Sequence, residues 1–475
     1  MNTPATVTVA AIPAIDPRVP WLARLAYALG NAAETVLHRS FELFVMFYYT
    51  QVLGVPGTVA GLAILAALVI DALVDPLVGS FSDSLQSRFG RRHTLMFASI
   101  APSTLLFYLL FTPPSGLSSA GLGLWLAATA IGLRTAIAFF YVPWSAQVAE
   151  LSPDPRERTT LAILRNIFGA VAQGAIVALA FDLFFVATPD YPRGQENPSA
   201  YPAFALVFGL GLGIMILLSA AGTYRRIQLI ERSETHKPVR FTLASLAHAW
   251  KDIIFHLPNF RCLFLGALFV LTALSAFNAF ALYMGSYFWV LPTVEIKQWQ
   301  LAFVVGAALT FVVGKPIVDR TQPSRVFSVG IAIGVAFFAA PVFLKLVGAL
   351  PDNHAFQFGV LCMSNAIAGF FLGLVMITSA LLASETADEF EFKRGVKGTA
   401  LLFGFITLSM KLASGLGKLL TGVAIDLIDL PAASNAATVS AQQLAALGWA
   451  CFVTLAVLGI LGAWVFSGYR APAVR

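Results

Sequence analysis

The sequence predicts an all-α, polytopic membrane protein whose twelve transmembrane helices form two six-helix bundles. A low charge content, recurring apolar runs and one-sided basic loops all lead to this prediction. Charged residues make up 11% of the 475 positions and hydrophobic residues 58%, whereas soluble domains carry about 25% charged residues. The mean hydropathy of +0.80 leaves more apolar surface than a soluble fold can bury. The expected surroundings are therefore a lipid bilayer.

Apolar runs of roughly 20 residues, enough to cross a bilayer, recur along the whole chain. The runs of the first half predict helices near 22–53, 58–82, 94–112, 118–150, 160–187 and 201–224. Those of the second half predict helices near 260–290, 298–318, 325–349, 355–385, 397–428 and 442–468. The expected domains are a tail (1–21), a first bundle (22–224), a central loop (225–258), a second bundle (259–468) and a tail (469–475).

Basic residues predict the orientation of these helices. The expected loops on the side of the 225–258 segment are rich in Arg and Lys, whereas the opposite loops carry only Arg193 and Lys297. Cytoplasmic loops are enriched in basic residues. We therefore expect the central loop and both termini to be cytoplasmic, in the inner membrane of a bacterium.

Several other classes of protein are disfavoured. Cys262, Cys362 and Cys451 are scattered along apolar helices and suggest neither disulfides nor a metal site. The histidines are dispersed, so no enzyme is expected, and no G-x-x-x-x-G-K-S/T loop indicates an ATP-driven pump. We expect a monomer with no cofactor beyond a coupling ion, a small-molecule substrate and no nucleic-acid partner.

The expected second helix carries two acids one turn apart, Asp71 and Asp75, in the stretch AALVIDALVDPLVG. Residues four apart share one helix face, and two neighbouring carboxylates repel each other when both are ionised. They should share a proton or hold Na⁺, helped by backbone carbonyls that Pro76 frees. The alternative is an ion pair with a base on another helix.

Lys411, in the expected eleventh helix, is a candidate for that base, because a lone ammonium in an apolar stretch is costly. It would bridge to Asp71 or Asp75 and compete there with a cation. Lys418, two turns further along, has no partner that the sequence identifies.

The expected first helix carries a polar stripe, Glu34, His38 and Glu42, with Arg39 beside it. One interpretation is a cavity lining that relays protons or holds substrate, since histidine titrates near neutral pH. The other is a salt-bridge cluster with an arginine of a neighbouring helix, Arg134 or Arg165.

Arg134 and Arg165 lie within the expected fourth and fifth helices. A guanidinium group suits carboxylate or phosphate recognition, so each is either a substrate contact or a partner of the nearby acids. Phe140, Tyr141 and Trp144 close the fourth helix and could stack on a sugar or steroid face or anchor the helix at the interface.

The two halves repeat one pattern, a glycine, an aspartate and then basic residues, at the end of the expected second and eighth helices. Parallel six-helix repeats are the architecture of major facilitator transporters. We expect these charges to form an inside latch between helices that part and rejoin. The latch candidates are Asp83, Arg88, Arg91, Arg92, Asp319 and Arg320.

Several stretches resemble the glycoside–pentoside–hexuronide:cation symporters of the major facilitator superfamily, the family of the melibiose permease. They include D-A-x-x-D-P-x-x-G and R-F-G-R-R near helix two, AELSPDPRERTTLAILRNIFG before helix five, and ETADEFEFKRG before helix eleven. The resemblance implies that Asp71 and Asp75 are the cation-site acids. It also places the family's helix-eleven lysine, helix-five arginine and helix-four tryptophan at Lys411, Arg165 and Trp144.

The chain departs from the melibiose-type pattern at the sugar site. Thr35 and Phe140 stand where the family has sugar-binding aspartates, and Glu34 faces about 100° away from Thr35 on the helix. Ile137 replaces a hydroxyl that helps bind Na⁺, so proton coupling is favoured over sodium. We expect cation-coupled symport of a glycoside, sugar or related small solute by alternating access. The alternative is symport of an anionic or amphipathic solute such as a lysolipid, a steroid acid or an organic anion.

Overall fold

The computed structural model describes residues 18–85, 87–231, 257–394, 399–432 and 439–470. Twelve long helices cross the described part of the chain, without a β-strand there, which confirms the expected all-α fold. The first half holds α1 (Trp21–Ser40), α2 (Gly57–Ser84), α3 (Arg91–Leu110), α4 (Ser119–Leu151), α5 (Pro155–Leu179) and α6 (Ala200–Glu231). The second half holds α8 (Pro258–Tyr283), α9 (Thr293–Arg320), α10 (Pro323–Leu346), α11 (His354–Arg394), α12 (Thr399–Ile428) and α13 (Ala441–Phe466).

Three of these helices continue into π-helical turns. The chain after α1 winds into η1 (Phe41–Val45) and η2 (Tyr48–Val52), α5 ends in η3 (Ala180–Phe184), and α8 ends in η5 (Met284–Phe288). A wider turn inserts one residue and rotates the side chains that follow it. Glu42, the last member of the predicted polar stripe, lies in η1, whereas Glu34 and His38 precede this turn in α1.

Eleven of the helices are long and apolar enough to span a membrane, and the first is not among them. The first helix carries Glu34, Arg39 and Glu42, which explains its lower hydropathy. Two helices run past their expected ends at 224 and 385: α6 continues to Glu231 and α11 to Arg394. Hydropathy marks the lipid-embedded run, and a helix can extend beyond it into water. The expected central-loop residues 232–256 lie outside the described residues.

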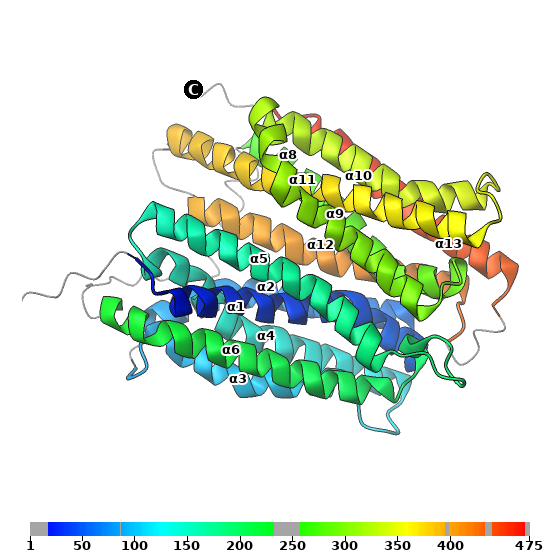
Figure 1. Ribbon diagram of the computed structural model, residues 1–475, viewed down its shortest axis with the longest axis horizontal. Coiled ribbons are helices and arrows are strands. Elements are labelled where there is room, and N and C mark those ends of the chain that lie inside the picture. Colours follow the sequence, from blue (N-terminus) through cyan, green and yellow to red (C-terminus); the bar gives the residue numbers. More distant parts are fainter. Residues whose placement is uncertain (1–17, 86, 232–256, 395–398, 433–438, 471–475) are drawn as a thin grey trace, which may run out of the picture.

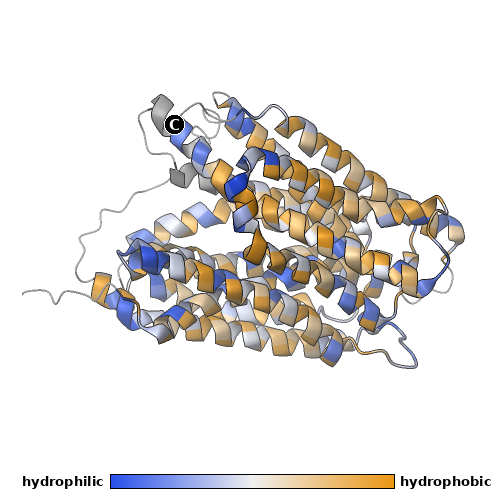
Figure 2. Ribbon diagram, turned by 45° about the horizontal axis from the view of Figure 1, so that its top comes forward, coloured by the Kyte–Doolittle hydropathy of each residue, from blue (hydrophilic) through white to orange (hydrophobic). Residues whose placement is uncertain are grey.

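Figure 1 shows α1 to α6 gathered in one half and α8 to α13 in the other, with α12 next to the first half. Figure 2 shows hydrophobic residues along the middle of most helices and hydrophilic residues gathered towards their ends. We call the end where α2 gives way to α3, which carries Arg88, Arg91 and Arg92, the basic end. The other end is called the opposite end.

Glycines bring α2 and α12 into close contact near the opposite end. A Cβ atom on Gly57 would lie 2.4 Å from the carbonyl oxygen of Gly422, and one on Gly61 would lie 2.7 Å from Cα of Leu419. Small residues let helix backbones approach this closely. The two helices form an antiparallel seam between the halves, which we call the α2–α12 seam.

Hydrogen bonds close the opposite end across the two halves. The hydroxyl of Tyr287 donates to Oε1 of Gln51 at 2.8 Å, and Nε2 of Gln195 donates to the hydroxyl of Ser286 at 3.0 Å. Asp426 of α12 accepts from the backbone N–H groups at the start of α2. The protein therefore adopts a conformation that is closed at the opposite end.

Candidate functional site

Asp71, Asp75 and Lys411 meet on the α2–α12 seam, further from the opposite end than its glycine contacts. The Lys411 ammonium lies 2.8 Å from Oδ2 of Asp71 and 2.6 Å from Oδ2 of Asp75. The four-residue spacing puts both acids on the face of α2 that meets α12. The Asp71 side chain is 3% exposed, whereas Asp75 and Lys411 keep 19% and 17% of their surface. One ammonium therefore bridges two carboxylates, one of them within reach of water.

Pro76 follows these acids inside α2. Proline has no N–H group to donate, so the carbonyl of Ala72 lacks its usual helical partner. Carboxylate and carbonyl oxygens suit a hard cation. Asp71, Asp75 and this carbonyl are the groups that could hold Na⁺, while the described residues contain no group of three or more His, Cys, Asp or Glu side chains placed for a metal ion.

Arg134 of α4 approaches the same acids from the side of the first half. Its Nη1 lies 3.8 Å from Oδ2 of Asp71, and its guanidinium group lies over the ring of Phe41 at 4.5 Å. Arg134 is 5% exposed, and its Nε and Nη2 atoms are buried without a hydrogen-bond partner. Buried N–H donors are nearly always paired, so this arginine has unused capacity to bind an acceptor.

A second ion pair crosses the two halves. Lys418 of α12 donates to Oε1 of Glu42 at 2.6 Å and to the hydroxyl of Ser414 at 3.0 Å, and the Ser414 hydroxyl also donates to Glu42. Lys418 is fully buried and Glu42 is 5% exposed. The sequence singled out both charges without pairing them. Their opposite signs and their place in apolar helices were the only available signal.

The polar stripe of α1 divides among different surroundings. Glu42 pairs with Lys418 rather than with Arg134 or Arg165, and Arg39 donates to the side-chain oxygens of Asn278 and Gln300 in the second half. The sequence did not indicate these two amides.

His38 is the exposed member of the stripe, and Glu34 is half-buried. His38 lies within electrostatic range of Glu34, Glu42, Arg134 and Lys418. His38 is therefore the member of the stripe whose side chain keeps the most accessible surface in this conformation.

The expected aromatic surface is packed against α1. The Trp144 ring stacks on Tyr27 at 5.1 Å and on Phe140 at 6.1 Å, and its Nε1 donates to the Tyr27 carbonyl oxygen at 2.9 Å. Trp144 and Phe140 are fully buried, whereas Tyr141 is half-buried. In this conformation Tyr141 is the aromatic of this set that a solute could reach.

Tyr141 lies within electrostatic range of Glu34, Arg165 and Asp75. The Arg165 guanidinium lies 5.5 Å from the centre of the Trp144 ring. Thr35 donates its hydroxyl hydrogen to the carbonyl oxygen of Asn31 at 2.7 Å. Tyr141 and Arg165 therefore lie near each other, whereas the hydroxyl of Thr35 is bound within α1.

The expected latch residues make contacts within each half. Arg91 and Arg92 both donate to Glu150 at 2.6 Å, and Arg92 lies 3.5 Å from Asp83. The sequence does not indicate Glu150, at the end of α4, as a partner of these arginines.

The other latch candidates lie in more open surroundings. Asp319 accepts from Lys315 one turn earlier on α9, at 3.0 Å, and Arg320 is exposed. The Arg88 guanidinium lies over the Phe89 ring at 4.8 Å.

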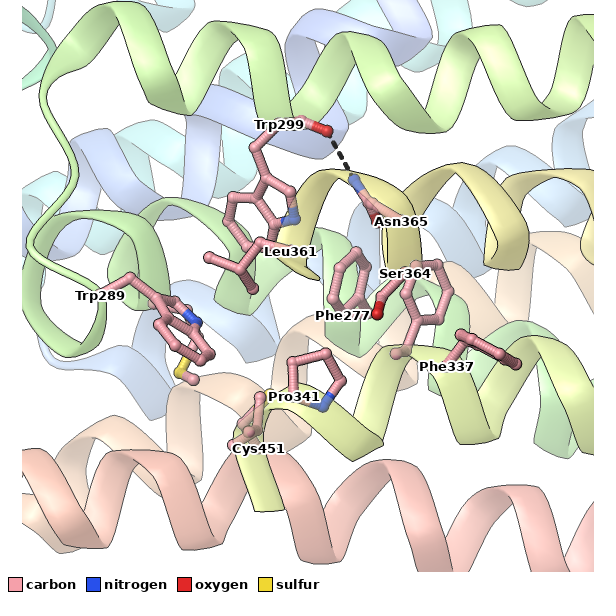
Figure 3. Close-up of a pocket in the computed structure, with 12 residues that line it drawn as sticks. Phe277, Trp289, Trp299, Phe337, Pro341, Leu361, Ser364, Asn365 and Cys451 are labelled. Carbon is pink, nitrogen blue, oxygen red and sulfur yellow. Dashed lines mark hydrogen bonds between the residues drawn. The ribbon is translucent and has the colours of Figure 1, made fainter. Parts of the chain in front are cut away.

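A separate cavity lies inside the second half. Figure 3 shows Phe277, Trp289, Trp299 and Pro341 around it, with Asn365 donating to the backbone oxygen of Trp299. Its lining comes from the second half and contains no charged side chain. It is therefore distinct from the charged site between the halves.

Comparison with known proteins matches this architecture. Residues 26–472 match the family described as MFS/sugar transport protein. The chain is 23% identical over 410 residues to the isoprimeverose transporter of Lactiplantibacillus pentosus, which covers 85% of this chain and 80% of that protein. It is 23% identical over 400 residues to the inner membrane symporter YicJ of Escherichia coli strain K12, covering 84% and 81%.

Among solved structures, the nucleoside transporter NupG is similar in fold. It superposes with a TM-score of 0.60 at 12% sequence identity, covering 95% of this chain and 100% of that one. At this identity the similarity concerns the fold alone.

Proposed function

Since this chain belongs to the MFS/sugar transport protein family, we propose that it is a proton-coupled symporter of a glycoside, sugar or related small organic solute. Its family and relatives make it a multi-pass membrane transporter of the major facilitator type, similar to the glycoside–pentoside–hexuronide:cation symporters. The proposal adds the coupling ion, the direction of transport and the residues that couple them.

The observation that carries the proposal is the Lys411 ammonium held between Asp71 and Asp75. The acids belong to one half and the lysine to the other. An ion pair buried in a membrane is costly to break by removing one charge. Protonation of the acids weakens this bridge, so the ion's occupancy bears directly on the contact between the halves.

A proton fits this site better than Na⁺. Ile137 lies on α4 at the position where the melibiose-type symporters supply a hydroxyl ligand. Its aliphatic side chain has no oxygen to bind a cation. Lys411 already occupies the space between the carboxylates. A proton needs only one carboxylate oxygen, whereas Na⁺ must displace the ammonium and collect several ligands.

The mechanism we propose is alternating access, in which the two halves rock about a site near the midplane. With the basic end cytoplasmic, the described conformation is closed on the outer side, because hydrogen bonds join the two halves at the opposite end. Asp83, Arg88, Arg91, Arg92, Asp319 and Arg320 would form the inside latch when the basic end closes. We further propose cytoplasmic termini and a monomeric protein in a bacterial inner membrane.

The test is the external pH of a lightly buffered suspension of cells that express the protein, after pulses of sugars, glycosides and organic anions. Proton symport predicts alkalinisation with one solute and its loss in Asp75→Asn, because the amide cannot carry the proton. Asp190→Asn, which removes an exposed acid between η3 and α6, should retain the signal.

Sodium-stimulated uptake without a pH change would show that the coupling ion bound at Asp71 and Asp75 is Na⁺ and not H⁺. Uptake by Asp75→Asn that requires neither cation would overturn the coupling assignment and leave a facilitator. An anionic or amphipathic solute is the second candidate, favoured by the unpaired N–H groups of Arg134.

A further inference from the structure

We propose that the solute carries a carboxylate or sulfonate group, which binds Arg134, and that this arginine links solute binding to protonation of Asp71 and Asp75. This inference rests on the proposed proton symport and names its substrate class. Three observations lead to it: the unused donors of Arg134, the charge balance of the interior, and the contact between Arg134 and Asp71.

Arg134 has donors but no acceptor of its own. Its Nε and Nη2 atoms are buried without a partner, and its single ionic contact, to Asp71, is long at 3.8 Å. The same Asp71 oxygen receives Lys411 at 2.8 Å. A guanidinium group presents a planar fork that matches a carboxylate or a sulfonate. An incoming anion would satisfy donors that the protein leaves unpaired.

The charges inside the bundle have an excess of positive over negative, which also favours an anionic solute. Among the described residues more than one turn from either end of α2, α4, α5, α12 and the continuous helical segment 21–52, bases outnumber acids by one. The acids are Glu34, Glu42, Asp71 and Asp75, and the bases are Arg39, Arg134, Arg165, Lys411 and Lys418. Protonating one of the paired acids adds another positive charge to this low-dielectric region. A bound monovalent anion reduces the excess, whereas a neutral sugar leaves it.

Three of the other bases are bound to acceptors. Lys418 is bound to Glu42, Lys411 to both α2 acids, and Arg39 to two amide oxygens. Arg165, over the Trp144 ring, has one buried donor atom without a partner, whereas Arg134 has two and also contacts Asp71. Arg134 therefore combines the larger unused donor capacity with a contact to the α2 acids.

The contact between Arg134 and Asp71 supplies the coupling. When the α2 acids are ionised, Asp71 attracts Arg134 and competes with a solute anion for it. Protonation removes that competitor, so it should strengthen anion binding, and by linkage the anion should strengthen proton binding equally. Empty and doubly loaded states are thus favoured over half-loaded ones.

The test uses purified full-length protein and matched probe pairs that differ in one charge: phenyl β-glucuronide with phenyl β-glucoside, gluconate with sorbitol, and benzenesulfonate with benzyl alcohol. Bound ligand stabilises the folded protein, so melting temperature against concentration gives each affinity at pH 5.5 and pH 8. We expect at least one anion to bind about 10- to 100-fold more tightly than its neutral partner, and more tightly at pH 5.5 than at pH 8.

Arg134→Gln should abolish the preference for the anion, and Arg134→Lys should retain part of it, because the charge remains but the fork is lost. Arg24→Gln, which removes an arginine paired with Glu157 near the basic end, should leave the preference intact. Equal affinity within every pair, or a preference that survives in Arg134→Gln, would overturn this inference.

The two failures are distinguishable. Alkalinisation of the cell suspension by a neutral solute, with no anion preference, refutes the anion assignment and leaves proton symport standing. Anion binding that depends on Arg134 but is equal at pH 5.5 and pH 8, without solute-driven alkalinisation, refutes proton coupling instead.

Discussion

The effect of a charged side chain on stability inside this bundle depends on the partner that it binds. Glu42 and Lys418 form a pair that is almost fully buried, with Ser414 completing the hydrogen bonding. Removing one partner of such a pair leaves an uncompensated charge, whereas removing both charges does not.

Lys418→Met should therefore destabilise the protein by about 3–5 kcal/mol, and the double variant Glu42→Gln with Lys418→Met should recover most of that loss. Thermal unfolding of the purified single and double variants measures both effects. Additive losses in the double variant would show that Glu42 and Lys418 stabilise the protein through other neighbours.

Spacing along one helix predicts some of these partners and not others. Asp71, Asp75 and Lys411 were brought together from the sequence because the acids share a face and the lysine needs a counter-charge. The sequence marks Glu42 and Lys418 as unusual charges but does not pair them, because the period of one helix does not reveal how a distant helix is rotated. The Asn278 and Gln300 oxygens that receive Arg39 give no hydropathy signal.

At the scale of helices, the α2–α12 seam depends on residues without side chains. A Cβ atom on Gly422 would lie 2.0 Å from the carbonyl oxygen of Gly57. A larger residue there is compatible only with a conformation in which the opposite end has opened.

Gly422→Val should therefore shift the population towards opening at the opposite end, by about 1–3 kcal/mol for such overpacking. The readout is the rate at which Ser286→Cys, buried at the closed opposite end, reacts with a membrane-impermeant thiol reagent in a background without the native cysteines. The rate should rise in Gly422→Val. It should not change in Gly211→Val, where a Cβ atom meets nothing within 4 Å.

Helix number and most helix edges follow from the sequence, because each apolar run must match the thickness of the bilayer. The extension of α6 to Glu231 and of α11 to Arg394 could not be predicted in this way, since polar turns beyond the lipid resemble loops in hydropathy. The sequence does not predict the π-helical turns Phe41–Val45 and Tyr48–Val52 either, because one inserted residue alters the apolar period only slightly.

For the whole molecule, the charge that crosses the membrane distinguishes the two kinds of solute. One proton entering with one monovalent anion moves no net charge, whereas one proton entering with a neutral sugar moves one. We expect proteoliposomes to take up the anion at a rate that a membrane potential barely changes. A steep dependence of anion uptake on the potential would indicate more than one proton per anion.

Orientation is also a property of the whole chain. The basic loops predict that both termini face the cytoplasm. Alkaline phosphatase fused to either terminus should therefore be inactive in a bacterial host, and green fluorescent protein fused there should fluoresce. Opposite results at the two ends would contradict the even number of spans.

The Lys411 bridge also has a consequence for the speed of the cycle. When no external ion is bound, the lysine itself supplies a positive charge between Asp71 and Asp75, so the unloaded carrier is already neutralised at this point. When the empty carrier reorients, Lys411 must either stay bound to the acids throughout or separate from them. We therefore expect the return of the empty carrier to limit net uptake, and solute exchange, which bypasses that step, to run faster than accumulation.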